Sequence, residues 1–228
     1  MKRLQIIFLV ITATCTQNSL SAQGTGGYHI TKTFHIASAG GWDYIAVGPE
    51  NNRLYVSHSS QVNILDKNTG DSIGVIPNTT GVHGIAFIPS SNKGYTSNGR
   101  LNTVTVFDLN TNAVLNQIAT GKNPDAIMYD AFSKRIITCN GGSNDLSIID
   151  PETNTVVATI PVGGKPETAV SDEAGTLYVN IEDKSMMAVV SMQTNTVLHQ
   201  WPIAPGESAT GLAIDLETKR LFAGCDNK

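Results

Sequence analysis

Short runs in which hydrophobic and polar residues alternate follow one another along most of the chain. In residues 84–119 the runs are GIAFI, KGYTS, NTVTVFD and AVLNQIA, and the breaks between them are PSSN, NGRL and LNTN. A period of two residues is typical of strands with one face against a core, and the breaks are rich in turn-forming residues. The pattern predicts an all-β protein built of short antiparallel strands.

A longer period organises these strands. The segments NILDKNTGDSIGVI, TVFDLNTNAVLNQI, SIIDPETNTVVATI and AVVSMQTNTVLHQW share a threonine, and the four threonines are 42, 42 and 41 residues apart: Thr69, Thr111, Thr153 and Thr194. A second series of aromatic or apolar positions has the same period: Tyr55, Tyr95, Ile137, Tyr178 and Phe222. Two independent series with one period predict a structural repeat of about 42 residues with four strands in each unit.

The turn chemistry supports this division. An aspartate ends the third run of three units and can bond to the backbone two residues later, while a glycine or asparagine four residues on tolerates positive φ: Asp66, Asp108 and Asp150, then Gly70, Asn112, Asn154 and Asn195. Pro77, Pro161 and Pro202 fall late in the fourth run, which predicts that the fourth strand is a sheet edge. Such units are the blades of a β-propeller. A stacked solenoid is the alternative, although one coil of a parallel β-helix is much shorter than this repeat of about 42 residues.

Several motifs resemble a known family. GYTSN at 94–98, LYVN at 177–180 and the D-x-x-T-N hairpins are similar to the YVTN-repeat, YncE-like β-propellers, and the similarity extends over residues 23–228. The resemblance implies an exported bacterial protein with seven blades. Most members of this family have no assigned reaction, so the resemblance is specific for the fold and says little about chemistry.

The repeat count predicts an incomplete ring. Four complete units occupy about 43–83, 84–125, 126–167 and 168–210, and a fifth begins with GLAID and RLFAG before the sequence stops at CDNK. YHITKTFHI at 28–36 reads as a fourth strand without a blade of its own. We expect a truncated propeller of four blades and a partial fifth, with about a hundred residues missing if the family's seven blades apply. Its open flanks would be apolar.

The N-terminal residues predict where the protein is located. MKR is a basic segment, LQIIFLVITA is an apolar stretch of ten residues, and SLSAQG offers a cleavage site after Ala22. Ten apolar residues are too few to span a bilayer, which needs about twenty. We therefore expect a signal peptide at 1–22, a propeller domain at 23–228, and a periplasmic or secreted protein without a transmembrane segment. A lipid anchor on Cys15 is the alternative, but TATC is a poor lipoprotein motif.

Composition and charge limit the kinds of partner that the protein is expected to bind. Only 15% of the residues are charged, against about 25% in an ordinary soluble protein, and the formal net charge is −4. A mildly acidic surface excludes a general affinity for nucleic acid. Cys139 and Cys225 lie in different repeats, too far apart for a disulfide, so both are expected to be free thiols. No cysteine-based metal site is expected, and the full-length protein is expected to be monomeric.

One face of the propeller is expected to carry the function. Antiparallel strands alternate in direction, so the links between blades and the hairpins between second and third strands share a face. The links place Asp43, His83, Asp125 and Glu167 at equivalent positions. The hairpins add further polar residues: Asn98, Arg100, Asn144, Asp145, Glu182, Asp183 and Lys184. Scaffold turns have no need of unlike charged residues at equivalent positions, so we expect a ligand-binding rim at the mouth of the channel.

Two functions fit such a rim. The first is an exported binding or scaffold protein that engages a small molecule or a protein partner, since no compact catalytic motif is present. The alternative is a metal-assisted hydrolase or lactonase in which rim carboxylates hold a divalent cation and His83 acts as a base. No metal-ligand spacing is diagnostic, no cofactor motif is present, and a quinoprotein or electron-transfer role ranks last because the chain has no CxxCH haem motif.

Overall fold

The structure is a computed structural model that describes residues 27–37, 40–49, 52–89 and 91–227. The chain divides into two compact units, Met1–Phe34 and His35–Lys228. In the described part of the first unit, residues 27–34 form no strand, and Lys32 lies over the ring of Phe34 at 4.9 Å. The predicted signal peptide at 1–22 lies outside the described residues.

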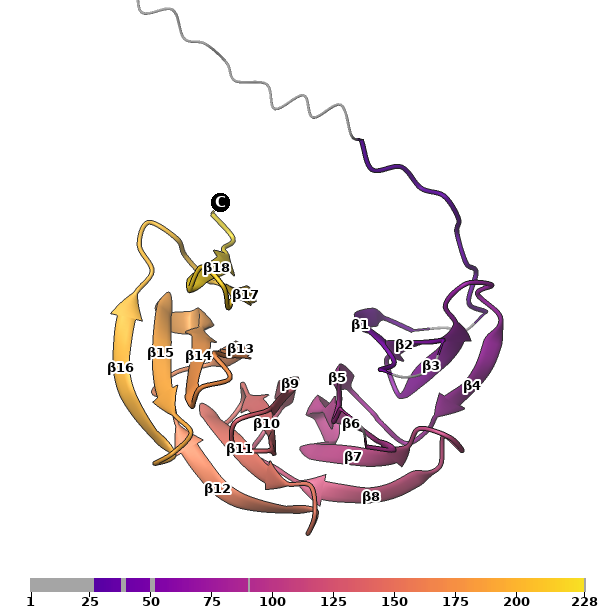
Figure 1. Ribbon diagram of the computed structural model, residues 1–228, viewed down its shortest axis with the longest axis horizontal. Coiled ribbons are helices and arrows are strands. Elements are labelled where there is room, and N and C mark those ends of the chain that lie inside the picture. Colours follow the sequence, from indigo (N-terminus) through magenta and orange to yellow (C-terminus); the bar gives the residue numbers. More distant parts are fainter. Residues whose placement is uncertain (1–26, 38–39, 50–51, 90, 228) are drawn as a thin grey trace, which may run out of the picture. The chain divides into compact units, whose positions relative to one another are not determined.

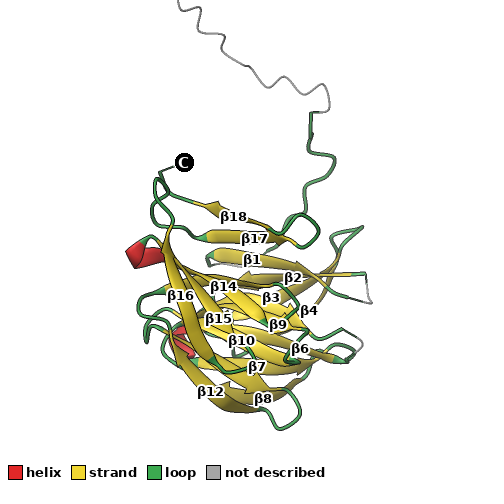
Figure 2. Ribbon diagram, turned by 60° about the vertical axis from the view of Figure 1, so that its left-hand side comes forward, coloured by secondary structure: helices red, strands yellow, loops and turns green. Residues whose placement is uncertain are grey.

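The second unit consists of antiparallel sheets, and almost all of its regular structure is strand (Figure 2). In each four-stranded sheet the strands pair in sequence order. The first sheet contains β1 (Trp42–Val47), β2 (Arg53–His58), β3 (Gln61–Asp66) and β4 (Ser72–Ile76). The second contains β5 (Val82–Phe87), β6 (Lys93–Asn98), β7 (Thr103–Asp108) and β8 (Val114–Ala119).

Two further four-stranded sheets and a strand pair follow. The third sheet contains β9 (Pro124–Asp130), β10 (Arg135–Asn140), β11 (Asp145–Asp150) and β12 (Thr155–Pro161). The fourth contains β13 (Pro166–Ser171), β14 (Thr176–Ile181), β15 (Met186–Ser191) and β16 (Thr196–Pro202), and the pair is β17 (Gly211–Asp215) and β18 (Arg220–Gly224). Two short 3-10 helices, η1 (Gly99–Leu101) and η2 (Glu182–Lys184), lie in the hairpins after β6 and β14.

The sheets of residues 42–224 follow one another like the blades of a propeller (Figure 1). The first strands β1, β5, β9, β13 and β17 contact one another in succession on the inner side, and β4, β8, β12 and β16 are the outer edges. The predicted repeat and the edge position of Pro161 and Pro202 are confirmed, and Pro77 lies one residue beyond β4. Each four-stranded sheet begins one or two residues before its predicted start, and its last strand ends six to eight residues before the predicted end of the unit.

The hairpins between third and fourth strands form through their aspartates. Asp108 Oδ1 accepts hydrogen bonds from the backbone N–H groups of Asn110 at 2.9 Å and Thr111 at 2.7 Å. Asn112 then adopts a φ of 61°, as the sequence predicts. These bonds stabilise the ionised carboxylate and lower the pKa of Asp108. The same arrangement recurs at Asp66 and Asp150, so the hairpin is fixed locally by the sequence of each repeat.

The hydrophobic core lies between neighbouring sheets. Tyr55 and Ile64 of the first sheet pack with Phe107 and Leu109 of the second, and the rings of Tyr55 and Phe107 are 5.8 Å apart. Equivalent clusters join the second sheet to the third and the third to the fourth. Each fully buried side chain of this size contributes about 1.5–3 kcal/mol, so the packing of sheet on sheet is the main source of stability.

Basic residues at the start of the second strands reinforce this packing. The Arg53 guanidinium donates to the carbonyl oxygen of Leu109 at 2.6 Å and to the side chain of Asn112 at 2.9 Å. Lys93, at the equivalent position of the next sheet, donates to the carbonyl oxygen of Pro151 at 3.1 Å. Each side chain therefore hydrogen-bonds to a turn of the following sheet.

The structure differs from one expectation, about residues 28–36, and agrees with another, about the two cysteines. Residues 28–36 were expected to form a strand, but the described residues 27–37 form none, and Tyr28 and Ile30 are exposed. A strand needs a neighbour to accept its backbone hydrogen bonds, and none of the described strands pairs with this segment. Cys139, in β10, and Cys225, after β18, are free thiols, as expected.

Gly94 tests the packing between Tyr55 and Phe107. A Cβ atom at Gly94 would overlap Cζ of the fully buried Phe107 ring. We expect Gly94→Ala to lower the free energy of unfolding by about 1–3 kcal/mol in urea denaturation, because the ring has no free space to enter. Gly211→Ala is the matched control in β17, where a Cβ meets nothing within 4 Å. Equal effects of the two substitutions would contradict this view of the core.

Tyr95 provides a second test. Its hydroxyl is buried without a hydrogen-bond partner, and burial followed by the charge of Asp150 raises its pKa to about 12. An acid whose pKa rises on folding loses stability as the pH rises from its unfolded pKa, near 10, through its folded value. We expect Tyr95→Phe to be neutral or stabilising by up to about 1 kcal/mol at pH 7. The substitution should also reduce the loss of stability between roughly pH 9 and pH 11, because phenylalanine has no group that ionises. A clear destabilisation at pH 7 would show that the hydroxyl has a partner.

Candidate functional site

A repeated β-bulge forms the candidate site. In each of the four-stranded sheets the register between first and second strands slips by one residue near the start of the first strand. The slip lies between Trp42 and Ile45 in the first sheet and between Val82 and Ile85 in the second. The four predicted rim residues Asp43, His83, Asp125 and Glu167 each lie inside it, as the second residue of β1, β5, β9 and β13. A bulge redirects side chains, and here it does so at equivalent positions.

Serine hydroxyls support two of the bulges. The bulged N–H of Tyr44 donates to the Ser57 hydroxyl at 2.6 Å, and the N–H of Gly84 donates to the Ser97 hydroxyl at 2.9 Å. Ser97 in turn donates to the backbone carbonyl oxygen of Asp125. The backbone that carries Asp125 is thus held by the neighbouring sheet. Gly84 has no side chain because a Cβ would lie 2.8 Å from Ile127 on β9.

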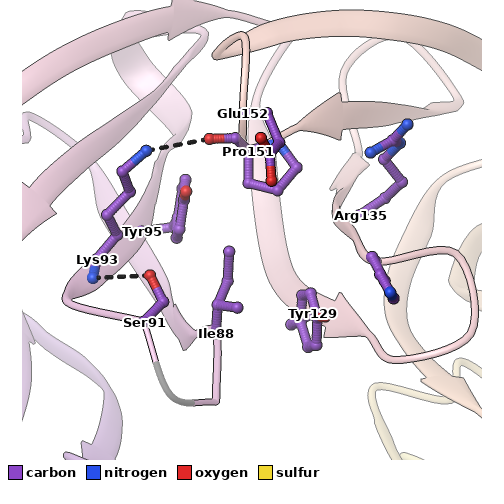
Figure 3. A pocket seen from close by; sticks show the side chains of 9 residues that line it. Ile88, Ser91, Lys93, Tyr95, Tyr129, Arg135, Pro151 and Glu152 are labelled. Carbon is purple, nitrogen blue, oxygen red and sulfur yellow. Dashed lines mark hydrogen bonds between the residues drawn. The ribbon is translucent and has the colours of Figure 1, made fainter.

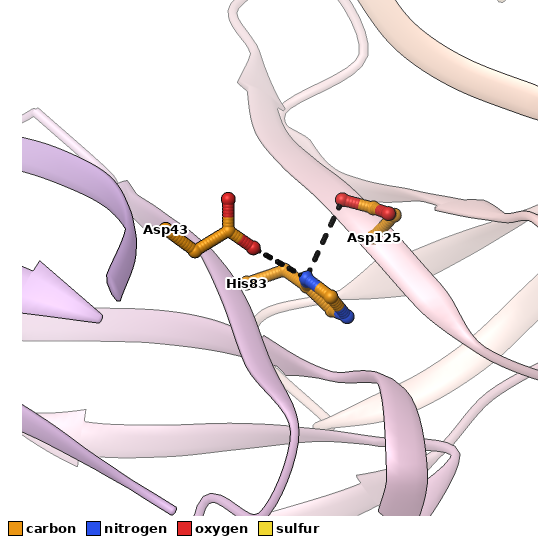
Figure 4. Close-up of side chains that lie close together, drawn as sticks. All are labelled: Asp43, His83 and Asp125. Carbon is orange, nitrogen blue, oxygen red and sulfur yellow. Dashed lines mark hydrogen bonds and ion pairs between the residues drawn. The ribbon is translucent and has the colours of Figure 1, made fainter. Parts of the chain in front are cut away.

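Three rim side chains from three successive sheets meet (Figure 4). His83 Nδ1 lies 2.5 Å from Asp43 Oδ2 and 3.8 Å from Asp125 Oδ1. One ligand atom from each of the three residues lies within 4.8 Å of the others. The side chain of Asp125 is 15% exposed, that of His83 27% and that of Asp43 42%, so the group is open on one side.

Glu167 belongs to a second group. Lys165 Nζ lies 3.2 Å from Glu167 Oε2 and forms a shorter ion pair with Glu182, and the Lys165 N–H donates to Asp183 Oδ1 at 2.7 Å. The hydrogen bond to Glu182 raises the pKa of Lys165. Burial, and then the charge of Asp125, raises the pKa of Glu167, whereas Lys165 opposes the increase. The two groups therefore share an electrostatic environment on one face.

Burial is also the largest cause of the raised pKa of Asp125, with His83 opposing it and Asp43 adding to it. The hydroxyl of Tyr44 lies close to these carboxylates. Burial and the charges of Asp125, Glu167 and Asp43 raise the pKa of Tyr44, and a hydrogen bond with Thr168 acts the other way. Tyr44 comes from β1 and Thr168 from β13, so the phenol stays protonated between the two groups of the rim.

The hairpin residues divide into two kinds. Arg100 lines the cavity at the rim, and Glu182 and Asp183 bond to Lys165, while Lys184 lies 3.6 Å from Asp183. The remaining three serve the scaffold: Asn98, Asn144 and Asp145. Asn98 is fully buried and donates to Thr103 and Thr105. Its amide is thus engaged within the second sheet, and its place in a ligand-binding rim stays a prediction.

The other two scaffold residues shape one hairpin. Asn144 is exposed with a φ of 60°, and its N–H donates to the carbonyl oxygen of Asn140 at 3.0 Å. Asp145 Oδ1 accepts a hydrogen bond of 2.7 Å from the Asn140 side chain. Both residues thus shape the hairpin between β10 and β11, Asn144 through its backbone and Asp145 through its carboxylate.

Four residues of the site were not predicted: Trp42, Tyr44, Asn123 and Lys165. Asn123 and Lys165 occupy the same repeat position, two residues before Asp125 and Glu167, where the first two sheets have Gly41 and Gly81. Aligning the repeats two positions earlier would have found them. Tyr44 occupies the position of Gly84, Ala126 and Thr168, and its size alone marks it as unlike its equivalents.

Two cavities are relevant to binding. The first has a volume of about 440 Å³ and opens beside Asp43 and His83, with Arg100, Asn123 and Trp42 among its lining residues. The second, of about 390 Å³, lies between the second and third sheets at the other ends of the strands (Figure 3). It is lined by Lys93, Arg135 and Glu152 among others, but Lys93 donates to Pro151 and Arg135 pairs with Asp150. Lys93 and Arg135 therefore serve the scaffold.

Comparisons with known proteins establish the fold alone. No family model matches this chain, and no curated protein matches it. Among solved structures, a chain of hydrazine synthase from Kuenenia stuttgartiensis is similar, with a TM-score of 0.74 and 19% sequence identity over 86% of this chain. This chain spans 58% of the length of that neighbour. The protein is therefore an all-β, propeller-like protein. Among the described residues, no helix has the length and apolar character needed to cross a membrane.

Lys165 tests the electrostatics of the rim. Because Lys165 opposes the rise in the Glu167 pKa, Lys165→Met should raise that pKa further, which carboxyl-carbon NMR titration would measure. A carboxyl with a raised pKa favours the folded state at low pH and loses this contribution as the pH rises through the folded pKa. The substitution should therefore destabilise the protein more at neutral than at acidic pH.

Lys184→Met is the control for this substitution, because Lys184 lies near Asp183 alone, at 3.6 Å, and is half exposed. We expect it to leave the pKa of Glu167 unchanged. If both substitutions moved that pKa by the same amount, the contact between Lys165 and Glu167 would not be its cause.

Proposed function

We propose that this protein is an exported, propeller-like binding protein that holds a small polar molecule at the rim formed by the starts of its inner strands. The observation that carries the proposal is the convergence of unlike charged groups from successive sheets beside one cavity. Asp43, His83 and Arg100 line that cavity together. Equivalent positions of a repeat serve the scaffold equally well with one residue type, so their divergence supports a role in recognition.

The lining of the cavity indicates the kind of ligand. A carboxylate, a guanidinium and the Asn123 amide offer hydrogen-bond acceptors and donors, and the exposed indole of Trp42 offers an apolar face. Such a set suits a small molecule that carries groups of both charges, for example an amino acid. Hydrogen bonds to charged groups have a fixed geometry, so such a site would select a ligand by the positions of its polar atoms rather than by its size.

We also propose a closed ring in the whole protein and export as its destination. Ile45 and Val47 of β1 are 64% and 56% exposed, whereas Ile85 and Phe87, their equivalents in β5, pack against the core of the first two sheets. Another sheet over β1 would cover them, and the resemblance to seven-bladed YVTN proteins supports such a ring. The predicted signal peptide supports a periplasmic or secreted location.

A second candidate function is a hydrolase or lactonase that acts on a molecule bound in the same cavity. The observation that favours it is the position of His83 between two carboxylates at the cavity wall. Such chemistry requires a polarised water, for which a divalent ion is the usual means. The likeness to hydrazine synthase brings no activity to this chain, because it concerns the fold.

A binding screen tests the proposal. The purified chain is screened by thermal shift against amino acids, amines, lactones and sugars, and each compound that binds is measured by titration calorimetry. We expect Arg100→Gln to weaken binding by at least about tenfold, because it removes a charged hydrogen-bond donor. Glu152→Gln, in the cavity at the opposite ends of the strands, is the control and should have no effect.

The outcomes separate the candidates. A compound recovered unchanged supports a binding protein, and a lactone recovered with its ring opened supports the hydrolase. If Arg100→Gln leaves every affinity unchanged while Glu152→Gln lowers it, the ligand occupies the other cavity and the rim proposal fails.

A further inference from the structure

We propose that Asp43, His83 and Asp125 form a binding site for a divalent first-row transition metal ion. The inference rests on the proposed function in one respect, since it names an ion that the same binding face would hold. It stands on the geometry of three side chains from three different sheets, and its test does not depend on any organic ligand.

The donor atoms have suitable separations. In a tetrahedral or octahedral site with metal–ligand bonds near 2.0–2.2 Å, neighbouring ligand atoms lie roughly 3–3.5 Å apart. His83 Nδ1 is 2.5 Å from Asp43 Oδ2 and 3.8 Å from Asp125 Oδ1, and one ligand atom from each of the three residues lies within 4.8 Å of the others. To bind a common ion, Asp43 would move slightly away from His83 Nδ1, now at 2.5 Å, and Asp125 slightly toward it, now at 3.8 Å.

The backbone holds the ligands in place. All three side chains lie within the β-bulges at the starts of β1, β5 and β9, and the Ser97 hydroxyl fixes the Asp125 backbone. The imidazole of His83 fits beside residue 99 because that residue is a glycine. A Cβ atom there would lie 2.8 Å from His83 Nε2. That Cβ would also lie 2.5 Å from Asn123 Oδ1, so the side chains of His83 and Asn123 both pack against Gly99.

The ligand types select the class of metal. One imidazole nitrogen with two carboxylate oxygens suits ions of intermediate softness such as Zn²⁺, Fe²⁺ or Co²⁺, whereas Ca²⁺ is bound by oxygen alone. The three residues leave part of the coordination sphere open toward the cavity of about 440 Å³. A site with three protein ligands and an open position can bind water or a ligand directly.

The position of His83 also argues against a purely structural role. The other three sheets carry a carboxylate at this position, and an ion pair with Asp43 alone does not require Asp125 to face the same nitrogen from the third sheet. A metal ion would neutralise the two aspartates and would add a bond to each of three successive sheets. Metal binding should therefore stabilise the fold, which gives a readout independent of activity.

The test uses the purified chain, stripped with a chelator and titrated with Zn²⁺, Co²⁺ and Ca²⁺ by calorimetry. We expect one Zn²⁺ per chain, a melting temperature several degrees higher with Zn²⁺, and a Co²⁺ absorption spectrum that indicates a nitrogen ligand. His83→Gln and Asp125→Asn should each weaken Zn²⁺ binding by at least about tenfold. Asp145→Asn is the matched control, since this carboxylate bonds to Asn140 outside the group.

Four results would overturn the inference. The first is Ca²⁺ binding as tight as that of Zn²⁺, and the second is Zn²⁺ affinity unchanged in His83→Gln. The third is Zn²⁺ binding that Glu182→Gln abolishes while Asp125→Asn preserves it, which would move the ion to the Lys165 group. Loss of organic-ligand binding in Arg100→Gln with no Zn²⁺ binding in the unsubstituted chain would leave the proposed function standing and the metal site rejected.

Discussion

The packing of one sheet against the next is the constraint on which the rest of the structure depends. Each sheet has two apolar faces, and Tyr55, Phe107 and their equivalents are buried only because a neighbouring sheet covers them. This requirement places the first strands side by side along the inner edge. Residues about forty positions apart in the sequence therefore come within hydrogen-bond distance, as Asp43 and His83 do.

The rim shows how a regular scaffold produces an irregular site. The bulge occurs in all four sheets, so the backbone offers the same position four times, and the side chains differ: Asp43, His83, Asp125 and Glu167. Burial there disfavours the charged form of a carboxyl group, and it therefore raises the pKa of Asp125 and of Glu167. Lys165 and His83 provide partial compensation. The mouth is thus held by electrostatics, while the interior is held by apolar packing.

The sequence predicted the features that depend on local chemistry. The hairpins at Asp66, Asp108 and Asp150, the outer position of the proline-bearing strands and the four-stranded unit follow from turn residues and a period of about 42. It did not predict the bulges, since a register slip of one residue leaves no composition signal. It also missed Lys165, which precedes the expected rim. It could not show that the Asn98 amide donates to Thr103 and Thr105, because those bonds depend on the pairing of β6 with β7.

The bulges have a consequence for how such proteins diversify. The serines beneath them, Ser57 and Ser97, bind backbone groups and not the rim side chains. Replacing a rim residue therefore leaves the supporting hydrogen bonds intact, and the fold tolerates new chemistry at the mouth without new architecture. A lineage could acquire different specificities by changes at residues 43 and 83, and an engineer could graft a designed recognition surface at the same two places.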